Sequence, residues 1–285
     1  MRRTVLIVPG LVQEPGGESV LRQKLPTLQA LSDLGNTFRL SPLPNVETPE
    51  ALYLGMPPTE GQLRQGPLTV AALGADPPER STHFHLSLLS LDEDRVVKPT
   101  HMPTPEEGRI LFERAKLLNT RTLTVLQGEE LDHALVWEGL GDFETHAPGT
   151  ELSYAKHRPE GDAEVLLRRL IDDSVNLLSD LELNQRRIDE GLQPFNILWP
   201  WGHGRRVPVR NLALMRAEPA MVESASLRMA GLSRLVGYSH VDRASVGRGL
   251  RTRFSQIAAR CRQRDLSIVV MDVEGLTLEE KDWFV

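Results

Sequence analysis

The sequence predicts an α/β protein with a mostly parallel sheet, helices on both faces and a smaller inserted α+β subdomain. The apolar runs Thr4–Val8 and Leu266–Met271 are short and continuous, as in strands that a parallel sheet buries on both faces. Ser19–Leu34 follows the first run with apolar residues at near-helical spacing, and a strand followed by a helix opens many α/β folds. From His83 onward apolar and polar residues alternate, which indicates a half-buried strand in an antiparallel region.

The domain organisation follows from where these patterns change. We expect residues 1–80 and 161–285 to form the α/β core, and residues 81–160 to form the inserted subdomain. Residues 41–80 are rich in Pro and Gly and have weak periodicity, which predicts long loops with a short helix near Pro49–Leu54.

The middle of the chain predicts one helix and one hairpin. Residues 105–118 have a helical pattern, whereas Thr122–Gln127 and His133–Trp137 indicate two strands joined by an acidic turn. The acidic triplet Asp92–Asp94 borders a strand, and we interpret it as a turn rather than as a metal site.

Four further elements are expected in the second half of the chain. Ala163–Leu181 is a long amphipathic helix, and Asn196–Trp199 is a short buried strand before a turn at Gly202–Gly204. Residues 219–236 and Gly247–Arg264 predict two more helices, the second with apolar residues on one side and arginines elsewhere.

Composition excludes several classes of protein. Of the 285 residues, 25% are charged and 40% are hydrophobic, as in a globular domain that needs no disulfide to fold. No apolar run approaches the roughly 20 residues that span a bilayer, and the N-terminal apolar stretch is too short for a signal peptide. Cys261 is the single cysteine, so we expect no disulfide and a cytoplasmic location.

Positive charge is concentrated near the C-terminus. The window Arg205–Arg264 carries thirteen Arg, no Lys and three acids, although the whole chain has a net charge of −6. Such asymmetry suggests an anionic ligand or partner, with a merely solvated surface as the alternative. We expect Arg253, Arg260 and Arg264 to form a basic surface for a protein partner. A nucleic-acid contact through this region has less support, because aromatic residues for base stacking are sparse.

Two local patterns are candidate sites. The turn at Gly202, His203 and Gly204 precedes Arg205, and glycine-rich turns beside arginines suit a phosphate or carboxylate, although a structural turn is the alternative. His83 and His85 share a strand face and could hold a metal, but a solvent-facing pair is the simpler interpretation. The motifs of nucleotide-binding loops, hydrolase elbows and zinc proteases are absent from the sequence.

Several segments, in order, resemble the archaeal-type cofactor-independent phosphoglycerate mutases of the alkaline-phosphatase superfamily. Leu25–Gly35, Gly66–Gly74, Phe84–Asp94 and Asp132–Gly149 are similar to segments of that family. The strongest similarity is to its N-x-x-R-I-x-x-G segment, its Pro-Ala-Asn strand and its R-G-A-G turn. The matching positions are Asn184, Arg187, Ile188, Gly191, Pro194, Asn196, Gly202 and Gly204.

The resemblance implies a truncated form of the mutase-like core with part of its substrate side retained. On that basis we expect a phosphate or acid ligand to be held by residues at the matching positions and their neighbours. These residues are Asn184, Arg187, Gly202, His203, Gly204, Arg205 and Arg234.

Departures from the family pattern remove its catalytic groups. Pro9 stands at the first metal-binding aspartate, Val46 at the nucleophilic serine and Ala230 at the lysine. Gly275 and Glu279 stand at the later metal-binding D-x-x-G-H segment. Because this chemistry needs two metals and a nucleophile, we expect no catalytic residue, no metal site and no cofactor.

The resemblance therefore implies a catalytically inactive mutase-like protein that acts as a regulatory or protein-interaction module. Val8–Leu11 and Trp199–Gly204 are similar to RpfE-type bacterial regulatory proteins, which suggests a DNA-processing partner such as a RecJ-type nuclease. One alternative is a metal-dependent mutase or phosphatase with an altered site that uses His83 and His85. Another alternative is a sensor of a phosphorylated metabolite.

Overall fold

The computed structural model divides the chain into two units, each with its own sheet. The terminal unit comprises residues 1–60 and 210–285, and the central unit comprises residues 61–209. The structure describes residues 2–8, 33–34, 48–57, 63–149 and 152–271. Within these residues, no helix is long and apolar enough to cross a membrane.

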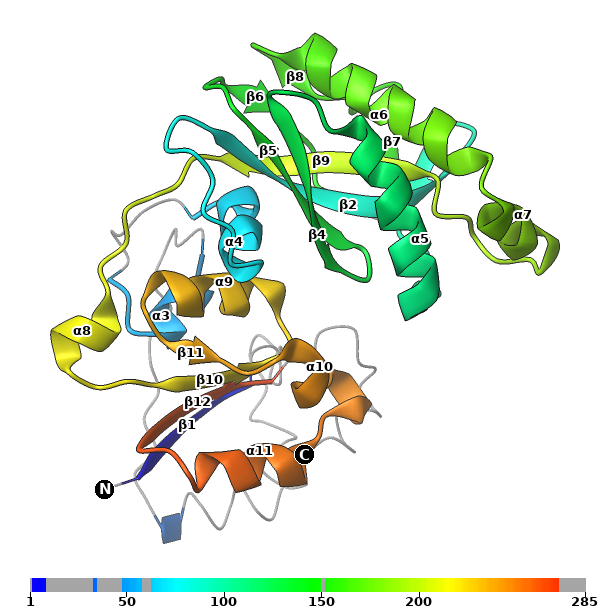
Figure 1. Cartoon of the computed structure of the whole chain (residues 1–285). Coiled ribbons are helices and arrows are strands. Elements are labelled where there is room, and N and C mark those ends of the chain that lie inside the picture. Colours follow the sequence, from blue (N-terminus) through cyan, green and yellow to red (C-terminus); the bar gives the residue numbers. More distant parts are fainter. Residues whose placement is uncertain (1, 9–32, 35–47, 58–62, 150–151, 272–285) are drawn as a thin grey trace, which may run out of the picture. The chain divides into compact units, whose positions relative to one another are not determined.

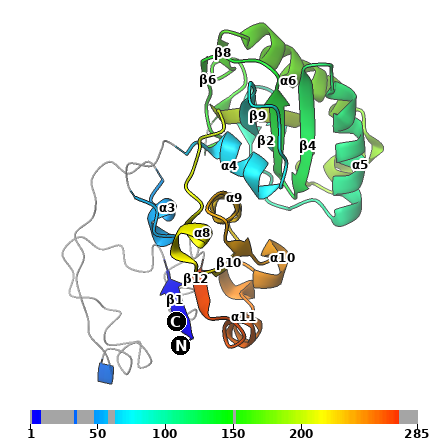
Figure 2. The ribbon, with the colours of Figure 1, turned by 60° about the vertical axis from the view of Figure 1, so that its left-hand side comes forward.

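The terminal unit contains a four-stranded parallel sheet. Its order is β1 (Arg3–Ile7), β12 (Leu266–Val270), β10 (Met221–Ser224) and β11 (Ser239–His240), and every pairing is parallel. Figures 1 and 2 show α9 (Leu227–Leu235) and α11 (Phe254–Cys261) on opposite sides of this sheet. The predicted parallel α/β arrangement is confirmed in this unit.

The remaining helices of the terminal unit are short. They are α3 (Glu50–Tyr53), α8 (Leu212–Arg216), α10 (Arg243–Val246) and the single turn η2 (Gly249–Arg251). The short helix predicted near Pro49–Leu54 is therefore present. The helix predicted over Ser19–Leu34 lies outside the described residues except for Asp33 and Leu34.

Three expectations for this unit are corrected. The predicted helix 219–236 is a strand followed by a helix, because the Ser226 side chain accepts from Met229 N and starts α9 there. The predicted helix Gly247–Arg264 is shorter and begins at Phe254, because Gly247 and Gly249 have positive φ angles of 80° and 50° and the turn Gly249–Arg251 is separate. The first strand is paired on one edge only within the described sheet, so Val5 and Leu6 are 44% and 54% exposed rather than buried.

The central unit contains an antiparallel sheet built around one long strand. The order of pairing is β4 (Leu123–Glu129), β5 (Asp132–Trp137), β2 (Thr82–Asp92), β3 (Arg95–Val97) and β7 (Leu152–Ser153). In addition, β9 (Ile197–Gly204) pairs with β2. A separate pair joins β6 (Phe143–Glu144) to β8 (Glu160–Gly161). The predicted hairpin is thus confirmed as β4–β5.

Helices cover both faces of this sheet. The helices are α4 (Gln65–Ala72), α5 (Pro105–Ala115), α6 (Glu164–Ser179), α7 (Glu182–Asp189) and the turn η1 (Lys116–Leu118). On one face, Phe84, Leu86 and Leu88 join α5 and α6 in the main core. On the other face, Val70 of α4 packs on Ala134 and Val136 of β5.

The sequence predicts a loop where the helix α4 lies, and the burial of this helix explains why the sequence pattern did not indicate it. Six of its eight residues, Gln65–Val70, are buried, so the helix has no polar face and shows no amphipathic pattern. The helices expected over 105–118 and Ala163–Leu181 do have such a face, and both are found.

The unit boundaries differ from those expected from the sequence. The central unit spans 61–209, so it includes α4 before residue 81 and α6, α7 and β9 after residue 160. The reason is pairing at long range: β9 runs antiparallel to β2, and α6 packs in the same core as β2. A short apolar run does not specify the sheet that it joins.

Candidate ligand-binding cleft

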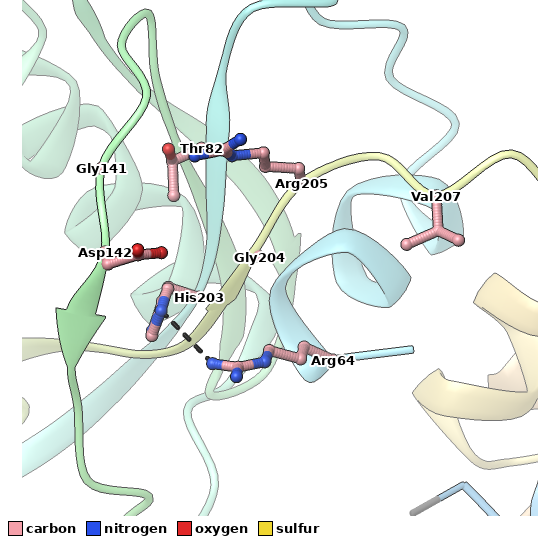
Figure 3. A pocket seen from close by; sticks show the side chains of 8 residues that line it. All are labelled: Arg64, Thr82, Gly141, Asp142, His203, Gly204, Arg205 and Val207. Atoms are coloured by element: carbon pink, nitrogen blue, oxygen red, sulfur yellow. Dashed lines mark hydrogen bonds between the residues drawn. The ribbon is translucent and has the colours of Figure 1, made fainter. Parts of the chain in front are cut away.

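The segment expected to turn at Gly202–Gly204 is the end of strand β9. It continues the pairing with β2, where Gly204 lies opposite His83. A cleft of about 240 Å³ opens beside this strand end within the central unit (Figure 3). Its polar side chains come from four separate segments of the chain: Arg64, Thr82, Asp142, His203 and Arg205.

His203 is held in a defined orientation in the cleft. Its Nε2 atom lies 3.3 Å from Nη1 of Arg64, and its Nδ1 atom lies 3.4 Å from Oγ1 of Thr145 (Figure 3 shows the Arg64 contact). A guanidinium can only donate, so Nε2 accepts and the ring proton is on Nδ1. Burial and the charge of Arg64 both lower the pKa of His203, which favours this neutral ring.

The cleft carries excess positive charge. Arg64 and Arg205 are exposed, and neither forms an ion pair with an acid among the residues that the structure describes. Asp142 is the acid that lines the cleft. The neighbouring Arg206 is different, because its Nη1 atom lies 2.6 Å from Oδ1 of Asp76. Two guanidinium groups in one cleft suit a phosphate or carboxylate, which accept their N–H donors in pairs.

Gly202 supports the cleft and does not line it. Its N–H donates to Oγ1 of Thr145 at 3.2 Å, so this amide is not free for an anion, contrary to expectation. Its φ is 61°, and a Cβ there would lie 2.8 Å from Cβ of Gln65. Glycine is therefore required for α4 to approach β9.

The structure does not bring Asn184 to this cleft. The side chain is fully buried at the opposite end of β9, where Nδ2 donates to the carbonyls of Leu178 and Phe195 at 2.8 Å each. Its Oδ1 atom accepts from Phe195 N at 2.7 Å. These bonds join the end of α6 to the start of β9 and use both N–H donors of the amide, which leaves it no donor for an anion.

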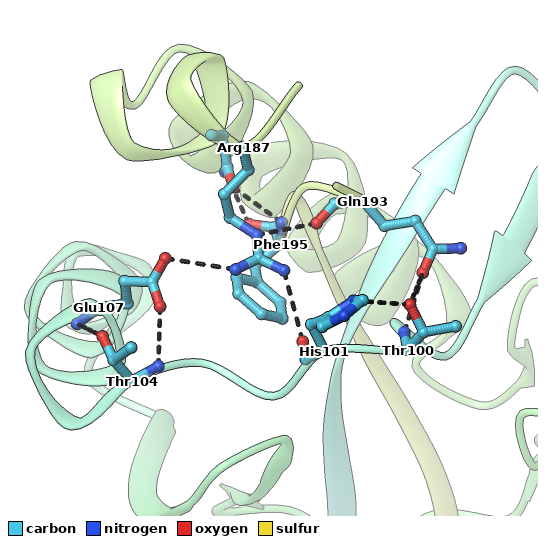
Figure 4. Close-up of polar contacts among 8 residues, drawn as sticks. Thr100, His101, Thr104, Glu107, Arg187, Gln193 and Phe195 are labelled. Atoms are coloured by element: carbon cyan, nitrogen blue, oxygen red, sulfur yellow. Dashed lines mark hydrogen bonds and ion pairs between the residues drawn. The ribbon is translucent and has the colours of Figure 1, made fainter. Parts of the chain in front are cut away.

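Arg187 lies near Asn184 and has a similar role (Figure 4). Its Nε donates to the carbonyl of Gln193 at 2.9 Å, and its two terminal nitrogens contact Glu107 and the carbonyl of His101 at 3.3 Å each. The guanidinium also lies 4.0 Å from the ring centroid of Phe195. The side chain is 6% exposed, so it ties α7 to α5 and to the loop before α5.

The predicted basic residues lie in the terminal unit. Arg234 is exposed on α9, and Arg253 and Arg264 are exposed beside α11. Arg260 differs, because it forms bonds of 2.6–3.0 Å with the carboxylate of Glu223, whose side chain is fully buried. It is therefore part of a buried ion pair rather than of an open basic surface.

The histidine pair is not solvent-facing. His83 and His85 are each 2% exposed. His85 lies 2.8 Å from Thr69 Oγ1 and 3.4 Å from Asp132 Oδ1, and Nε2 of His83 lies 2.9 Å from Ser81 Oγ. No group of three or more His, Cys, Asp or Glu side chains that could hold a metal occurs within the described ranges.

The family's catalytic positions are only partly described. Pro9, Val46, Gly275 and Glu279 lie outside the described residues, whereas Ala230 is buried on α9. Pro9, Val46, Gly275 and Ala230 carry no metal ligand or nucleophile, so these four residues do not fit the two-metal site that the resemblance implies, whereas Glu279 carries a carboxylate.

Sequence reasoning missed three residues of the cleft. Arg64 precedes a helix that has no amphipathic pattern, Thr82 begins a strand, and Asp142 lies in a loop. The Gly-Pro pair after Arg64 could have indicated the helix start. Nothing local indicates Asp142, because only the tertiary fold brings it to His203.

Comparison with known proteins shows distant homology to cofactor-independent phosphoglycerate mutases. The chain is 25% identical over 225 residues to a probable 2,3-bisphosphoglycerate-independent phosphoglycerate mutase of Geobacter sulfurreducens, covering 72% of this chain and 56% of that protein. It is 26% identical over 231 residues to the 2,3-bisphosphoglycerate-independent phosphoglycerate mutase 1 of Methanocaldococcus jannaschii, covering 70% of this chain and 54% of that protein. The chain thus spans about half the length of these relatives. No protein-family profile matches it.

Solved structures give the same fold. The cofactor-independent phosphoglycerate mutase of Thermoplasma acidophilum superimposes with a TM-score of 0.55 at 20% identity, covering 99% of this chain and 80% of that one. The PH0037 protein of Pyrococcus horikoshii gives a TM-score of 0.59 at 14% identity, covering 95% and 70%. The fold is therefore phosphoglycerate-mutase-like, with one parallel and one antiparallel sheet.

Proposed function

We propose that this chain is a catalytically inactive, phosphoglycerate-mutase-like protein that binds a small phosphorylated acid and acts as a regulatory module. The observation that carries the proposal is the cleft of the central unit, where Arg64 and Arg205 lie beside the neutral His203. This arrangement offers guanidinium donors to an anion, and Asp142 is the one carboxylate among the described residues that line it.

The lack of catalysis is supported by the residue types at the resembling positions. Pro9, Val46, Ala230 and Gly275 replace two metal-binding positions, the nucleophile and the lysine. A valine side chain cannot attack phosphorus, and proline and glycine cannot lower the pKa of a nucleophile through a metal. The loss of several groups together is harder to compensate than the loss of one.

The nature of the ligand is inferred from the distant relatives. Their names specify a phosphoglycerate, which carries a phosphate and a carboxylate on three carbons. Arg64 and Arg205 could each bind one anionic group of such an acid, and Thr82 or the backbone of Gly204 could bind its hydroxyl. Binding without turnover would allow the protein to report the concentration of the acid.

Calorimetric titration with 3-phosphoglycerate tests the binding proposal. We expect Arg64→Gln and Arg205→Gln each to weaken binding by about tenfold or more, as for loss of one charge-assisted contact. Arg206→Gln is the matched control, because Arg206 is adjacent and already paired with Asp76. No binding to the wild-type chain, or equal weakening by the control, would overturn the proposal.

A mutase and phosphatase assay with added manganese, cobalt or zinc tests the lack of catalysis. We expect no turnover above the protein-free rate. Turnover that a chelator abolishes would instead support the alternative of an enzyme with an altered site, and would direct attention to Thr48, the hydroxyl nearest to Val46 in the sequence.

A second candidate function, contact with a protein partner, is favoured by one observation. Arg253 and Arg264 are exposed and form no ion pair within the described part of the terminal unit. An acidic surface on a DNA-processing enzyme, such as a RecJ-type nuclease, would suit them. Charge reversal at both positions, with Arg260 left intact, should weaken capture of that nuclease. Unchanged capture would remove this surface from consideration, and binding of an oligonucleotide alone would indicate nucleic acid instead.

A further inference from the structure

A second cleft lies at the other end of the central sheet. It has a volume of about 380 Å³ and is formed where the turn between β2 and β3 meets the segment Leu152–His157. The first cleft contains Thr82 at the start of β2, whereas Arg95 follows the end of that strand. The eleven residues of β2 separate the two clefts by roughly 33 Å, at about 3.3 Å for each of ten steps along the strand.

The acid in this second cleft is already satisfied by the protein. The Asp94 carboxylate accepts from Ser153 Oγ at 2.6 Å and from Ala155 N at 2.8 Å. These two hydrogen bonds, that of Ser153 first, lower the pKa of Asp94. The carboxylate therefore holds the 153–155 segment against the turn.

The basic groups of the cleft form no direct ion pair with this acid, although the charges of Lys156 and His157 help to lower its pKa. Arg95 and Lys156 are exposed, and neither forms an ion pair at 4.0 Å or less among the described residues. Nδ1 of His157 lies 3.0 Å from Ser153 N and 3.2 Å from the Ser153 carbonyl oxygen, so it is occupied within its own segment and Nε2 is the nitrogen available to a ligand. Three donors of different kinds therefore line one cleft, beside the apolar side chains of Val97 and Leu152.

We propose that this cleft is a second anion site, which takes a phosphate or carboxylate group carried on a small apolar body. Arg95 and Lys156 would bind the anionic group, His157 would donate from Nε2, and Val97 with Leu152 would contact the apolar part. The site does not depend on the function proposed above, because it shares no residue with the first cleft.

Titration of the ¹⁵N-labelled full chain with inorganic phosphate, and separately with butyrate, tests the site by NMR. The titrations use the variant Arg64→Gln/Arg205→Gln, in which the first cleft has lost its cations. We expect saturable shifts of the amides in segments 94–97 and 152–157. A stronger response to phosphate identifies a phosphorylated ligand, and a stronger response to butyrate identifies a carboxylic acid.

Charge-removing variants then locate the binding. Arg95→Gln and Lys156→Gln should each weaken the apparent affinity by about fivefold or more, as expected when one charged donor is lost. Lys98→Gln is the control, because Lys98 is an exposed cation just after β3 that does not line the cleft. The proposal is overturned if neither anion shifts these amides saturably, or if Lys98→Gln weakens binding as much as Lys156→Gln does.

Discussion

At the scale of single residues, arginines of similar appearance in the sequence have different roles. Arg253, Arg260 and Arg264 share one stretch, yet Arg260 alone pairs with the buried Glu223. The pair raises the pKa of Arg260, because hydrogen bonds to Glu223 stabilise the charged guanidinium. Glu223 lies near the end of β10, so the pair joins the sheet to α11.

Replacement of Arg260 should destabilise the terminal unit. Arg260→Ala leaves the Glu223 carboxylate buried without its partner, which we expect to cost roughly 2–4 kcal/mol. Hydrogen exchange of the peptides that contain β10 and β12 measures this loss locally. Arg262→Ala, an exposed change directly after α11, is the control. Equal exchange in both variants would contradict a role for the pair in stability.

Buried histidines make the stability of the central unit dependent on pH. Burial lowers the pKa of His133 to about 4, and Gly128 N donates to its Nδ1 at 3.1 Å. In the unfolded chain the ring has an ordinary pKa of about 6.5, so the unfolded state binds a proton first as the pH falls. The contribution of His133 is therefore present above about pH 6.5 and is lost between that pH and about 4.

We expect the free energy of unfolding to fall by about 3 kcal/mol between pH 7 and pH 4 because of this one ring. His133→Asn keeps an acceptor near Gly128 but removes the titrating group. Urea unfolding followed by tryptophan fluorescence should therefore show a shallower pH dependence for this variant. Trp137, Trp199 and Trp201 all lie in the central unit and report on it. An unchanged pH dependence in the His133→Asn variant would show that other titrating groups determine the pH dependence of unfolding.

At the scale of elements, the helix α4 depends on glycine for its position on the sheet. A Cβ at Gly66 would lie 2.3 Å from the carbonyl oxygen of His83, which is backbone and cannot rotate away. Gly202 of β9 also allows α4 to come close, because a Cβ there would lie 2.8 Å from Cβ of Gln65. Close approach therefore explains why α4 contains a residue of low helix propensity.

Replacement by alanine should have opposite effects on stability at two glycines that lie in helices. Gly66→Ala should destabilise the central unit by more than about 2 kcal/mol, because the backbones of α4 and β2 must separate. Gly108→Ala should stabilise it by about 0.5–1 kcal/mol, since Gly108 lies in α5 with no atom near its Cβ position and alanine is the better helix former. Urea midpoints of the two variants check this, and destabilisation by both would contradict the contact argument.

At the scale of the whole molecule, the two units are built differently in sequence. The central unit is one continuous segment, 61–209, with its own core, whereas the terminal unit needs both ends of the chain to complete its parallel sheet. The first candidate cleft and the second both lie entirely within the continuous segment.

We therefore expect the fragment 61–209 to fold by itself. It should unfold cooperatively in urea, followed by the fluorescence of its three tryptophans, and it should bind phosphorylated acid with an affinity within about threefold of the full chain. The fragment 210–285 should show no cooperative transition, because it lacks β1. Failure of the 61–209 fragment to fold would show that contacts outside it are required.

Sequence patterns predicted elements well where one face of the element contacts water. The hairpin β4–β5 and the helices α5 and α6 have polar faces that set a clear period, and all were anticipated. The helix α4 and the strand β10 were missed, because a buried helix has no polar face and a four-residue strand is too short to show a period. The boundaries of the central unit were missed because they depend on which strand β9 joins.

The sequence by itself determined the α/β class, through local periodicity. A series of short similar segments also indicated the distant relation to phosphoglycerate mutases, which the comparisons support. Only the tertiary structure decided which polar residues meet. It brought Arg64 and Asp142 to His203, buried Asn184 and Arg187 at the far end of β9, and paired Arg260 with Glu223. Such meetings depend on long-range pairing and packing, which no local pattern encodes.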